Sequence, residues 1–483
     1  MAQANTSKRQ LRYVKQSWAF GAAIPTGGST PKLTNARSTD WSMSAGKTTQ
    51  QSEELRADSM PSDSVLVGLS GSGQSNFELS FNTHNDFLEN VCRSTFSAAV
   101  TTTATASVAA SGNNWDLTVT ASAAFAVGQW VRTTAFATSP TVNNGVFVVL
   151  SKPNATTLRL SNPAGTVTTA QTATVTSSRM LRMGTNVQYM LVEGEHSDIN
   201  AFQRLEDARV ASLSLSLSTQ QKVTGTIQFQ GRRVQAPPPE DVTGAGTSGN
   251  LQFAAGPPGT ITGPTNTWTG GPTVAIAVGD FVKIVNSPNA TNNGIYKASV
   301  VTGTVLTVTN TDGSAKTFIA ENNSTATVSQ YATVGDAIPT AATTTSILNA
   351  STNVGSLTEA GTALGVAISA FDMTIDGQLQ PVTQVGSASL AGITDGTFAV
   401  TGTLTAYYEN NTLYNKVIAD AETSHSGRFT DAAGNIMIYT VPRMKLEGDP
   451  GGGGQNTLIP LPLKYSALLD PATSTLVQFD LLP

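Results

Sequence analysis

Residues 65–91 read VLVGLSGSGQSNFELSFNTHNDFLENV, and this stretch decides the fold. Its first part alternates, with glycine or polar residues between apolar side chains at odd positions: Val65, Val67, Leu69, Phe77, Leu79 and Phe81. Since successive side chains of a strand point to opposite faces, we expect a long strand with one apolar and one polar face. Gly71 and Gly73 leave the apolar face bare, which favours a bulge or bend. After Asn85 the apolar residues follow helical spacing, so a short helix should come after a polar link.

The same unit returns near the other end of the chain. Residues 396–418 read GTFAVTGTLTAYYENNTLYNKVI, again an alternating strand, a polar link and a helical pattern. Both copies have an aromatic pair of equal spacing across the link and a related short segment upstream: Phe81 and Phe87, Tyr408 and Tyr414, residues 41–46 and 371–377. This shared order predicts an internal duplication, with chance similarity between β-rich segments as the alternative.

The composition favours a mainly β protein of about three domains. The chain has 483 residues, of which 12% are charged and 6% aromatic, and small, hydroxyl and β-branched residues dominate. That composition suits strands and turns better than helices. The 27 basic residues do not outnumber the 32 acidic ones, which argues against a basic DNA-binding surface. The net charge of −5 instead suits a surface along which DNA slides without sticking.

The cysteine content and the chain termini indicate the compartment. The single cysteine, Cys92, excludes an internal disulfide, and its place at the end of an apolar helix predicts a buried structural thiol. The first residues, MAQANTSKRQLRYVKQ, lack the apolar segment of a signal peptide, and no apolar run is long enough to span a membrane. We therefore expect a protein that is made in a cytoplasm, without a secretory signal or a membrane span.

Two further segments share a second repeated pattern. Residues 98–178 contain VGQWV, NNGVF and TTLRL, and residues 244–330 contain VGDFV, NNGIY and VLTV in the same order. Asn-Gly between alternating apolar residues is a strong signal for a two-residue hairpin turn. We expect two copies of a small all-β module, a β-sandwich or barrel, one inserted into each half of the duplicated domain.

These patterns divide the chain into six parts. They are an extended N-terminal arm (1–40), a first half (41–97 and 179–240), a first inserted module (98–178), a second inserted module (244–330), a linker (331–370) and a second half (371–483). Within the first half we expect a short strand followed by a polar loop over residues 47–63. Ser197 and Asp198 should cap a short helix that contains Ile199, Phe202 and Leu205.

No residue pattern points to catalysis, a metal or a cofactor. The three histidines, His84, His196 and His425, fall in turn or loop contexts, and no HxxxH or CxxC spacing suggests zinc. There is no GxSxG elbow, and the glycines of residues 451–454 lack the lysine of a phosphate-binding loop, so they predict a flexible inter-subunit loop. The segment at Asp431 resembles part of a calcium loop but lacks ligands, which favours a turn.

Five segments carry a resemblance to a known family: residues 62–91, 211–232 (ASLSLSLSTQQKVTGTIQFQGR), 396–417, 429–448 (FTDAAGNIMIYTVPRMKLEG) and 458–471 (LIPLPLKYSALLDP). In this order they resemble the strand-and-helix core of siphophage major tail tube proteins. The two modules look like surface domains that some of these proteins carry, although the shortest members lack them. The resemblance implies a structural protein of the virion tail, assembled in the bacterial host cytoplasm, whose stacked rings form the channel for DNA ejection. It also implies contacts with a tape measure protein, a tail terminator and distal tail proteins.

On this interpretation, the polar faces of the two long strands line the channel through Gln74, Asn76, Glu78, Thr401, Thr403 and Thr405. The candidates for contact between rings are Glu53, Glu54, Asp58 and Asp63. Double-stranded DNA passes without specific binding. Because single-unit family members form hexameric rings, a chain with two units predicts trimeric rings with pseudo-sixfold symmetry. The modules should be dispensable, so that deletion of residues 98–178 leaves polymers intact.

The alternative function is a surface adhesin whose modules bind carbohydrate. Such a site needs exposed aromatic rings, and the modules offer Trp115, Trp130 and Trp268. Trp130 aligns with Phe281 of the other module, which indicates a core position rather than a sugar platform.

Overall fold

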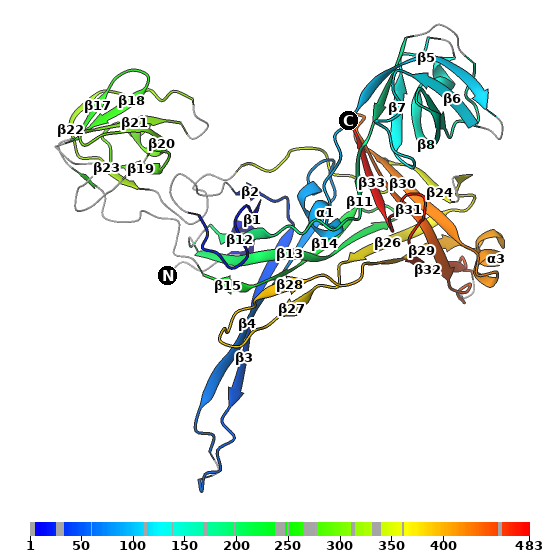
Figure 1. Cartoon of the computed structure of the whole chain (residues 1–483). Coiled ribbons are helices and arrows are strands. Elements are labelled where there is room, and N and C mark those ends of the chain that lie inside the picture. Colours follow the sequence, from blue (N-terminus) through cyan, green and yellow to red (C-terminus); the bar gives the residue numbers. More distant parts are fainter. Residues whose placement is uncertain are drawn as a thin grey trace.

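The computed structural model describes residues 5–25, 33–58, 60–110, 114–137, 139–167, 172–197, 199, 201–236, 247–248, 251–263, 268, 276, 278–310, 314–330, 340–359, 362–452 and 456–483. Strands account for 54% of residues and helices for 6%, so the prediction of a mainly β fold is confirmed. Figure 1 shows the main groups of strands: a 17-stranded main sheet, a closed barrel and an eight-stranded sheet.

The main sheet takes strands from both ends of the chain. It contains β1 (Arg9–Lys15), β2 (Thr34–Asn35), β3 (Asp40–Gln51), β4 (Ser64–Glu78), β11 (Arg179–Arg182), β12 (Met190–His196), β13 (Ala201–Ser218), β14 (Thr224–Gly231), β15 (Arg233–Gln235), β24 (Val354–Glu359), β25 (Thr362–Ala363), β26 (Ile368–Asp376), β29 (Ala399–Tyr407), β30 (Thr423–Thr430), β31 (Ile436–Glu447), β32 (Pro460–Ala467) and β33 (Gln478–Leu482). A separate ribbon of β27 (Gln380–Val382) and β28 (Gly392–Thr394) connects β26 to β29. A 3-10 turn, η1 (Thr6–Lys8), precedes β1.

Eight strands of the main sheet form one antiparallel series in the order β3–β4–β14–β13–β26–β29–β32–β31. The first four strands belong to the first half and the last four to the second half. The junction between the halves is the ladder of β13 with β26, which runs from Ser212 opposite Asp376 to Ser218 opposite Ala370. Since β26–β29–β32–β31 repeats the order β3–β4–β14–β13, the duplication is visible in the strand order.

The helices repeat in the same way. The long strand of each half leads through a short link to a helix, α1 (Asn85–Cys92) or α3 (Thr412–Ile418). Arg93 and Asp420 each lie eight residues after the first residue of their helix, and they have φ values of 52° and 50°. Left-handed backbone is uncommon for residues other than glycine. Its presence at equivalent positions therefore supports the duplication.

The strand register also corrects the match upstream of the long strands. β3 places Asp40 opposite Asn76, and β26 places Asp372 opposite Thr403. Since Asn76 and Thr403 lie at equivalent distances before their helices, Asp40 corresponds to Asp372. The match expected from the sequence, which began at Trp41, is therefore wrong by two residues.

One core is shared by both halves. Phe77, Leu79 and Phe81 are 2%, 2% and 8% exposed and pack into this core, as the alternation predicts. Leu404 of β29 belongs to the same core. Cys92 is fully buried in it, and burial raises the pKa of its thiol to about 12, which confirms the prediction of a structural thiol.

Each inserted segment forms its own group of strands. Module 1 is a closed barrel of β5 (Thr101–Ala110), β6 (Asn114–Val119), β7 (Trp130–Thr134), β8 (Gly145–Asn154), β9 (Thr157–Leu160) and β10 (Ala173–Ser177), with a one-turn helix, α2 (Pro140–Asn143). Module 2 comprises β16 (Thr247–Ser248), β17 (Leu251–Ala254), β18 (Gly259–Thr262), β19 (Phe281–Val285), β20 (Gly294–Val301), β21 (Val305–Thr309), β22 (Glu321–Ser324) and β23 (Thr327–Gln330), with the 3-10 turn η3 (Ala290–Asn292). The order β10–β7–β8–β9–β6–β5 recurs as β23–β19–β20–β21–β18–β17.

The repeated NNG triplets do not form the expected two-residue hairpin turns. Asn144 has φ −90° and Asn293 has φ −70°, whereas a type I′ turn needs positive φ at both central residues. Each triplet instead ends a short helical turn. The first asparagine of each triplet bridges to a distant loop: the Oδ1 atoms of Asn143 and Asn292 accept from the backbone N–H of Thr166 and Ile319. The triplet is therefore a loop-fixing motif.

Distant strands pair across two of the expected domain boundaries. The proposed N-terminal arm, residues 1–40, contains β1, whose seven residues pair with β12 and bury Leu11 and Tyr13 in the main core. The proposed linker, residues 331–370, contains β24, which pairs with β30. Residues 331–339 of that linker lie outside the described part.

The helix expected near residue 199 is a strand. Asp198 lies outside the described residues, but Phe202 and Leu205 belong to β13, which pairs with β12 on one side and with β15 on the other. Nearly every residue from Phe202 to Val210 is buried. Apolar residues on both faces of a strand produce helix-like spacing, which explains the error.

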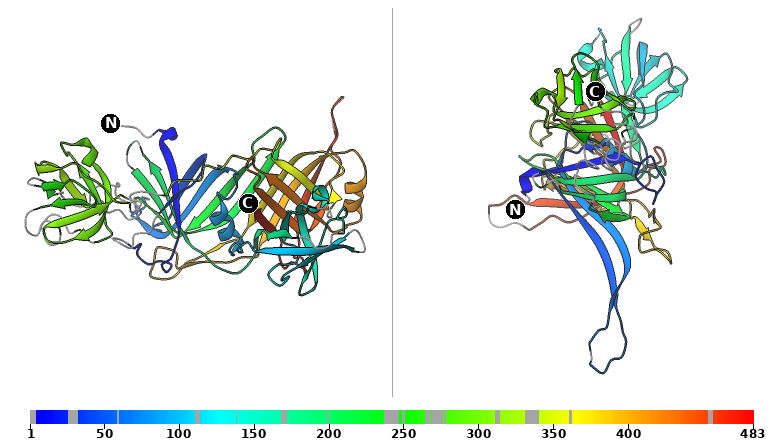
Figure 2. Two further views of the ribbon diagram at one scale, coloured as in Figure 1. Left: turned by 90° about the horizontal axis from the view of Figure 1, so that it is seen from above. Right: turned by 90° about the vertical axis from the view of Figure 1, so that its left-hand side faces the viewer.

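Strands β3 and β4 leave the body of the molecule as a long hairpin (residues 47–69), which Figure 1 and the right-hand view of Figure 2 show projecting away from the other strands. The polar loop expected over residues 47–63 is shorter, because β3 continues to Gln51. Val65 and Val67, on the apolar face of the predicted strand, are 55% and 44% exposed, since the body covers neither side of the hairpin there.

Candidate functional site: a polar sheet face and its surroundings

The series of eight strands carries one continuous polar face. Following the register across all eight strands gives a single row of polar side chains: Asp40, Asn76, Thr226, Ser214, Thr374, Thr401, Ser466 and Lys445. The neighbouring row contains Glu78, Thr224, Ser216, Asp372, Thr403, Lys464 and Glu447. The opposite face is apolar and forms the shared core.

The candidate channel residues of both halves lie on this face. Five of them are half-buried and Thr401 is exposed: Gln74, Asn76, Glu78, Thr401, Thr403 and Thr405. The sheet register therefore brings together two sets that are more than 300 positions apart in the sequence. The alternation identified their side of each strand, but not that the two strands belong to one sheet.

Hydrogen bonds between neighbouring strands order this face. Asn76 Oδ1 accepts from Thr226 Oγ1 at 3.0 Å and from Gln74 Nε2 at 3.3 Å. Lys222 Nζ donates to Glu78 Oε1 at 2.7 Å, which neutralises that carboxylate at the end of β4. Hydroxyl and amide groups thus satisfy one another, and the two rows contain more carboxylates than lysines. Such a surface offers no cluster of cations to phosphate groups.

The tip of the long hairpin combines acidic and apolar residues. The four acidic candidates are exposed there: Glu53, Glu54, Asp58 and Asp63. Arg56 forms a bidentate ion pair with Asp58 at 3.0 and 2.9 Å, and its guanidinium lowers the pKa of that carboxyl. Beside them Leu55 is 100% and Met60 66% exposed. Exposed apolar side chains at the end of a projecting hairpin suit contact with another protein surface.

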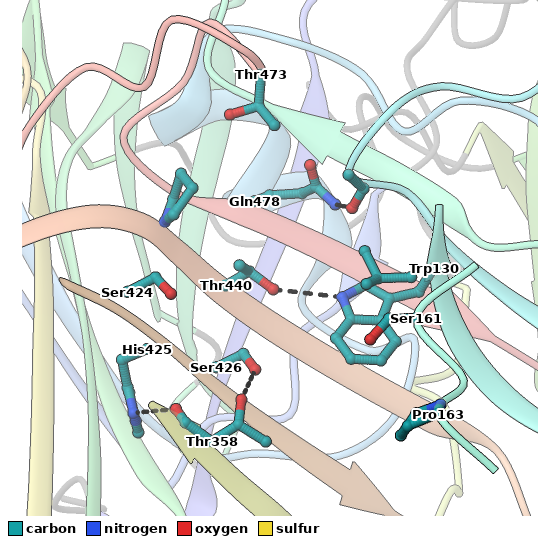
Figure 3. Close-up of a pocket in the computed structure, with 13 residues that line it drawn as sticks. Trp130, Ser161, Pro163, Thr358, Ser424, His425, Ser426, Thr440, Thr473 and Gln478 are labelled. Carbon is teal, nitrogen blue, oxygen red and sulfur yellow. Dashed lines mark hydrogen bonds between the residues drawn. The ribbon is translucent and has the colours of Figure 1, made fainter. Parts of the chain in front are cut away.

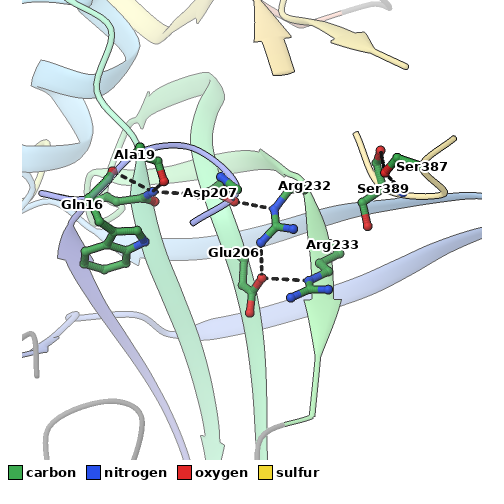
Figure 4. Close-up of polar contacts among 10 residues, drawn as sticks. Gln16, Ala19, Glu206, Asp207, Arg232, Arg233, Ser387 and Ser389 are labelled. Carbon is green, nitrogen blue, oxygen red and sulfur yellow. Dashed lines mark hydrogen bonds and ion pairs between the residues drawn. The ribbon is translucent and has the colours of Figure 1, made fainter. Parts of the chain in front are cut away.

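A buried polar network fixes the root of the long hairpin (Figure 4). Arg232 pairs with Glu206 at 2.7 Å and with Asp207 at 2.5 Å, and Arg233 pairs with Glu206 at 2.8 Å. Gln16 Nε2 donates to Asp207 Oδ1 at 2.7 Å, which ties the N-terminal segment to the same cluster. Because the charges are paired and all but Arg233 are buried, the network holds β13, β15 and the segment after β1 in one arrangement.

Gly71 lets the hairpin root pass close to this network. A Cβ atom there would lie 2.4 Å from Leu205 Cδ1 and 2.9 Å from the backbone carbon of Arg233. The ladder is regular at this glycine, and the irregularity of the strand pair falls between Thr48 and Thr49. The bulge expected at Gly71 is therefore wrong in position, and the glycine serves a close approach.

Module 1 is packed against the second half. Trp130 and Val146 of the module contact Ile436, Ile438 and Leu482. Beside them lies a pocket of about 380 Å³ that Trp130, Ser161, Thr358, His425 and Gln478 help to line (Figure 3). Trp130 is thus an inter-domain contact, and the prediction that it belongs to the core of its own module is wrong.

A buried carboxyl joins module 1 to the last strand. Asp480 accepts from Ser178 Oγ at 2.5 Å and from Gln478 Nε2 at 2.6 Å, and burial raises its pKa to about 6. Arg132 donates to the carbonyl oxygen of Pro483 at 2.6 Å. These contacts change the expectation for residues 98–178, because their deletion would uncover an apolar surface and a buried acid.

Two of the three histidines, His84 and His425, are buried. His84 precedes α1, and burial lowers its pKa to about 4. His425 lies within β30, where its ring nitrogens are 3.0 Å from the Thr358 carbonyl and 3.0 Å from the Tyr439 hydroxyl, and burial lowers its pKa to about 4. His196 ends β12. The loop contexts expected for His196 and His425 are wrong because both lie in strands.

Within the part of the chain that the structure describes, no group of three metal-ligating side chains comes together. In that same part no helix is long and apolar enough to cross a membrane. The residues of the glycine-rich segment beyond Gly452 and before Asn456 lie outside the described part. Asp431 forms the expected turn, in which its Oδ1 accepts from Ala433 and Asn435 N–H groups at 2.9 Å.

A duplicated sheet with an apolar side, a polar side and a projecting hairpin defines a mainly β protein with two related halves. The model of the phage tail tube protein family matches the chain in two stretches, residues 6–311 and 265–467. The chain therefore belongs to the phage tail tube protein family, a family of structural proteins of the virion tail. The two matches follow the two halves, although they overlap within module 2. No curated protein matches the chain.

Proposed function

We propose that this chain is the major tail tube subunit of a siphophage and that its rings stack into the channel through which DNA leaves the virion. The polar face that runs without interruption across eight strands and both halves carries this proposal. Closing such a sheet between subunits removes its open edges and turns one face inward. The apolar face already packs on the core, so the polar face is the one that lines the channel.

The strand count favours three chains in each ring. Neighbouring strands lie about 4.8 Å apart, and side chains rise about 5 Å from a sheet. Strands in a closed barrel tilt by about 40° from its axis, which widens the barrel. With eight strands per chain, two chains would give about 32 Å between backbones and about 22 Å free, which is barely as wide as a duplex. Three chains give about 48 Å between backbones and about 38 Å of open channel, which admits a duplex together with its water and counterions.

The chemistry of this face suits passage rather than binding. Tight DNA binding requires cations that replace the counterions of the phosphates. The rows across the sheet are mostly hydroxyl and amide groups, with carboxylates such as Glu78 and Asp372 among them. DNA would therefore move along the channel without specific contacts.

The long hairpin is proposed to contact the next ring through Leu55, Met60 and the acidic side chains Glu53, Glu54, Asp58 and Asp63. Its length beyond the body and the exposure of its apolar tip support this role. Replacing both Leu55 and Met60 by Asp should leave single rings but prevent stacking, as seen by negative-stain electron microscopy. Val385→Asp, at a fully exposed valine outside the hairpin, is the matched control. Tubes of normal length from the double variant would contradict this role of the hairpin.

The further partners of the proposed tube are a tape measure protein inside the channel and the terminator and distal tail proteins at its ends, with assembly in the bacterial cytoplasm. The alternative, a carbohydrate-binding adhesin, finds no support in the modules. Trp115 and Trp268 are fully buried, and Trp130 packs on the second half. Electron microscopy of the purified protein tests the proposal: we expect hollow tubes with three chains per ring. A ring of six chains, or no polymer, would refute it.

A further inference from the structure

The two ends of the eight-strand series each have a strand edge without a ladder partner in the described part of the chain. β3 pairs only with β4, and residues 445–447 of β31 pair only with β32. Unpaired strand edges are sites at which another strand adds. The structure holds its own template for such an addition, because the junction of β13 with β26 joins the equivalent strands of the two halves.

The register of the template transfers residue by residue. Asn76 and Thr403 are equivalent, and they lie opposite Thr226 and Lys464. Those two residues in turn lie opposite Ser214 of β13 and Glu447 of β31. Glu447 is therefore the counterpart of Ser214 at the free edge of the second half.

The same transfer applies to the other edge. Thr374 of β26 lies opposite Thr401, and Ser42 of β3 lies opposite Gln74, which is the equivalent of Thr401. Ser42 is therefore the counterpart of Thr374. In the template Ser214 lies opposite Thr374.

We propose that β31 of one copy pairs antiparallel with β3 of the next copy, with Glu447 opposite Ser42. This inference rests on the proposed function and names the surfaces that close the ring. In this register Lys445 lies opposite Ser44, and Leu446 lies opposite Met43. The polar rows then continue from chain to chain, and Leu446 of one copy meets Met43 of the next, which is half-buried at the edge of the core.

The alternation of hydrogen-bonded and non-hydrogen-bonded pairs at the β13–β26 junction agrees with the backbone groups that point outward at the free edge of β3. The bonds Gly377 N to Ala211 O and Thr219 N to Ser369 O make the odd-numbered pairs of the junction the hydrogen-bonded ones. Trp41 is the counterpart of a residue in one of these hydrogen-bonded pairs, so its backbone N–H and C=O should point away from β4, toward the free edge. Its carbonyl does accept a hydrogen bond from Arg9 on that side.

In the ring, the N–H of Gly448 from the neighbouring copy donates to the Trp41 carbonyl in place of Arg9. Arg9, which also donates to Asp40 at 2.8 Å, then lies where Asp40 meets Asp449 of the neighbouring copy. Its charge offsets the repulsion between those two carboxylates. In the free chain Arg9 thus occupies the Trp41 carbonyl, and in the ring it keeps only its contact with the carboxylates.

Engineered disulfides test the register. Ser214 and Thr374 form a non-hydrogen-bonded pair, with Cα atoms about 4.5 Å apart, inside the range a disulfide spans. The same distance applies to Ser42 and Glu447 across the proposed contact. Both side chains are exposed in the free chain, and the native Cys92 is buried, so the substitutions leave the fold and the background chemistry unchanged.

Three double variants are compared after assembly and mild oxidation on non-reducing gels. S42C/E447C should give covalent dimers and trimers and then stop, because the third bond closes the ring. S214C/T374C, the control for geometry, should give only an intrachain bond. T48C/E447C, the control for register, should give no bond, because Thr48 lies about 20 Å further along the strand.

The outcomes separate this inference from the proposed function. Tubes without cross-links in S42C/E447C, together with a closed bond in S214C/T374C, overturn the register but keep the tube. Equal cross-linking in T48C/E447C also overturns the register. A ladder that continues to six chains keeps the register and refutes the trimeric ring. Protein that forms neither tubes nor cross-links contradicts both.

Discussion

Replacing His425 by a side chain that does not titrate should make the free energy of unfolding fall less between pH 8 and pH 5. The pKa of this histidine is about 4 in the folded chain and 6.5 in an unfolded one. A histidine whose pKa is lowered by folding destabilises the fold as the pH falls below the unfolded value, because the unfolded chain takes up the proton first. Between pH 8 and pH 5 this amounts to about 2 kcal/mol for one such histidine.

His425→Gln keeps the two hydrogen bonds and removes the titration. Its amide nitrogen replaces the ring N–H toward the Thr358 carbonyl, and its amide oxygen accepts from the Tyr439 hydroxyl, whose pKa is raised by burial. The lost ring contact with Phe371, 5.0 Å between centroids, costs about 1 kcal/mol at every pH. We therefore expect the variant to be less stable at pH 8, but to lose about 2 kcal/mol less than the wild type on going to pH 5.

Urea unfolding of the unassembled chain at pH 8 and pH 5, at constant ionic strength, measures this difference. His84→Gln is the matched control, since the pKa of that buried histidine is also about 4, and it should flatten the profile by the same amount. Asp480→Asn should do the opposite. Burial raises the pKa of Asp480 to about 6, so the folded chain takes up a proton at this carboxyl before the unfolded chain does. The wild type therefore gains about 1 kcal/mol in the free energy of unfolding by pH 5 from this group, and the variant lacks that gain. Equal pH dependence in the wild type and His425→Gln would refute the reasoning.

Three further predictions concern the hairpin, the modules and the channel. Gly71→Val should lower stability by about 3 kcal/mol, because Leu205 and the Arg233 backbone leave no room for the side chain. Gly68→Val should not, because its Cβ would meet only Thr48, at 3.6 Å. Thermal unfolding midpoints of the two variants would show the difference. Deletion of module 2 should leave tubes intact under the electron microscope, whereas deletion of module 1 should lower the yield of soluble protein because it exposes the contact around Ile436; equal yields would contradict this. Thr401→Lys should make assembled tubes retain duplex DNA in a salt-dependent way, with a slope of about 0.9 for each phosphate contacted, and the same substitution at an exposed threonine of module 1 should not.

Local patterns in the sequence determined the parts of the structure that depend on neighbouring residues. The alternation before Phe81 and the helical spacing after Asn85 predicted the strand, the link and α1, because side-chain direction in a strand or helix follows directly from its repeat. The same reasoning gave β29 and α3, and therefore the duplication. It also separated the polar side chains Gln74, Asn76 and Glu78 from their apolar neighbours.

Contacts between distant residues decided what those patterns could not. Alternation gives the apolar side of a strand but not what covers it. Val65 and Val67 share the apolar side with Phe77, yet they lie exposed on a projecting hairpin. Phe202 and Leu205 have the spacing of a helix, yet β12 and β15 pair on both sides and make the segment a strand.

The pairing of the two halves into one sheet is likewise decided by tertiary structure. The ladder between β13 and β26 brings Asn76 and Thr403 onto one surface, and no local pattern in either segment specifies the other as its neighbour. Trp130 repeats the position of Phe281 in sequence, but the second half lies over it and makes it a contact between domains. Side-chain periodicity is thus a property of the chain, whereas the partner of each face and edge is set by which segments pack together.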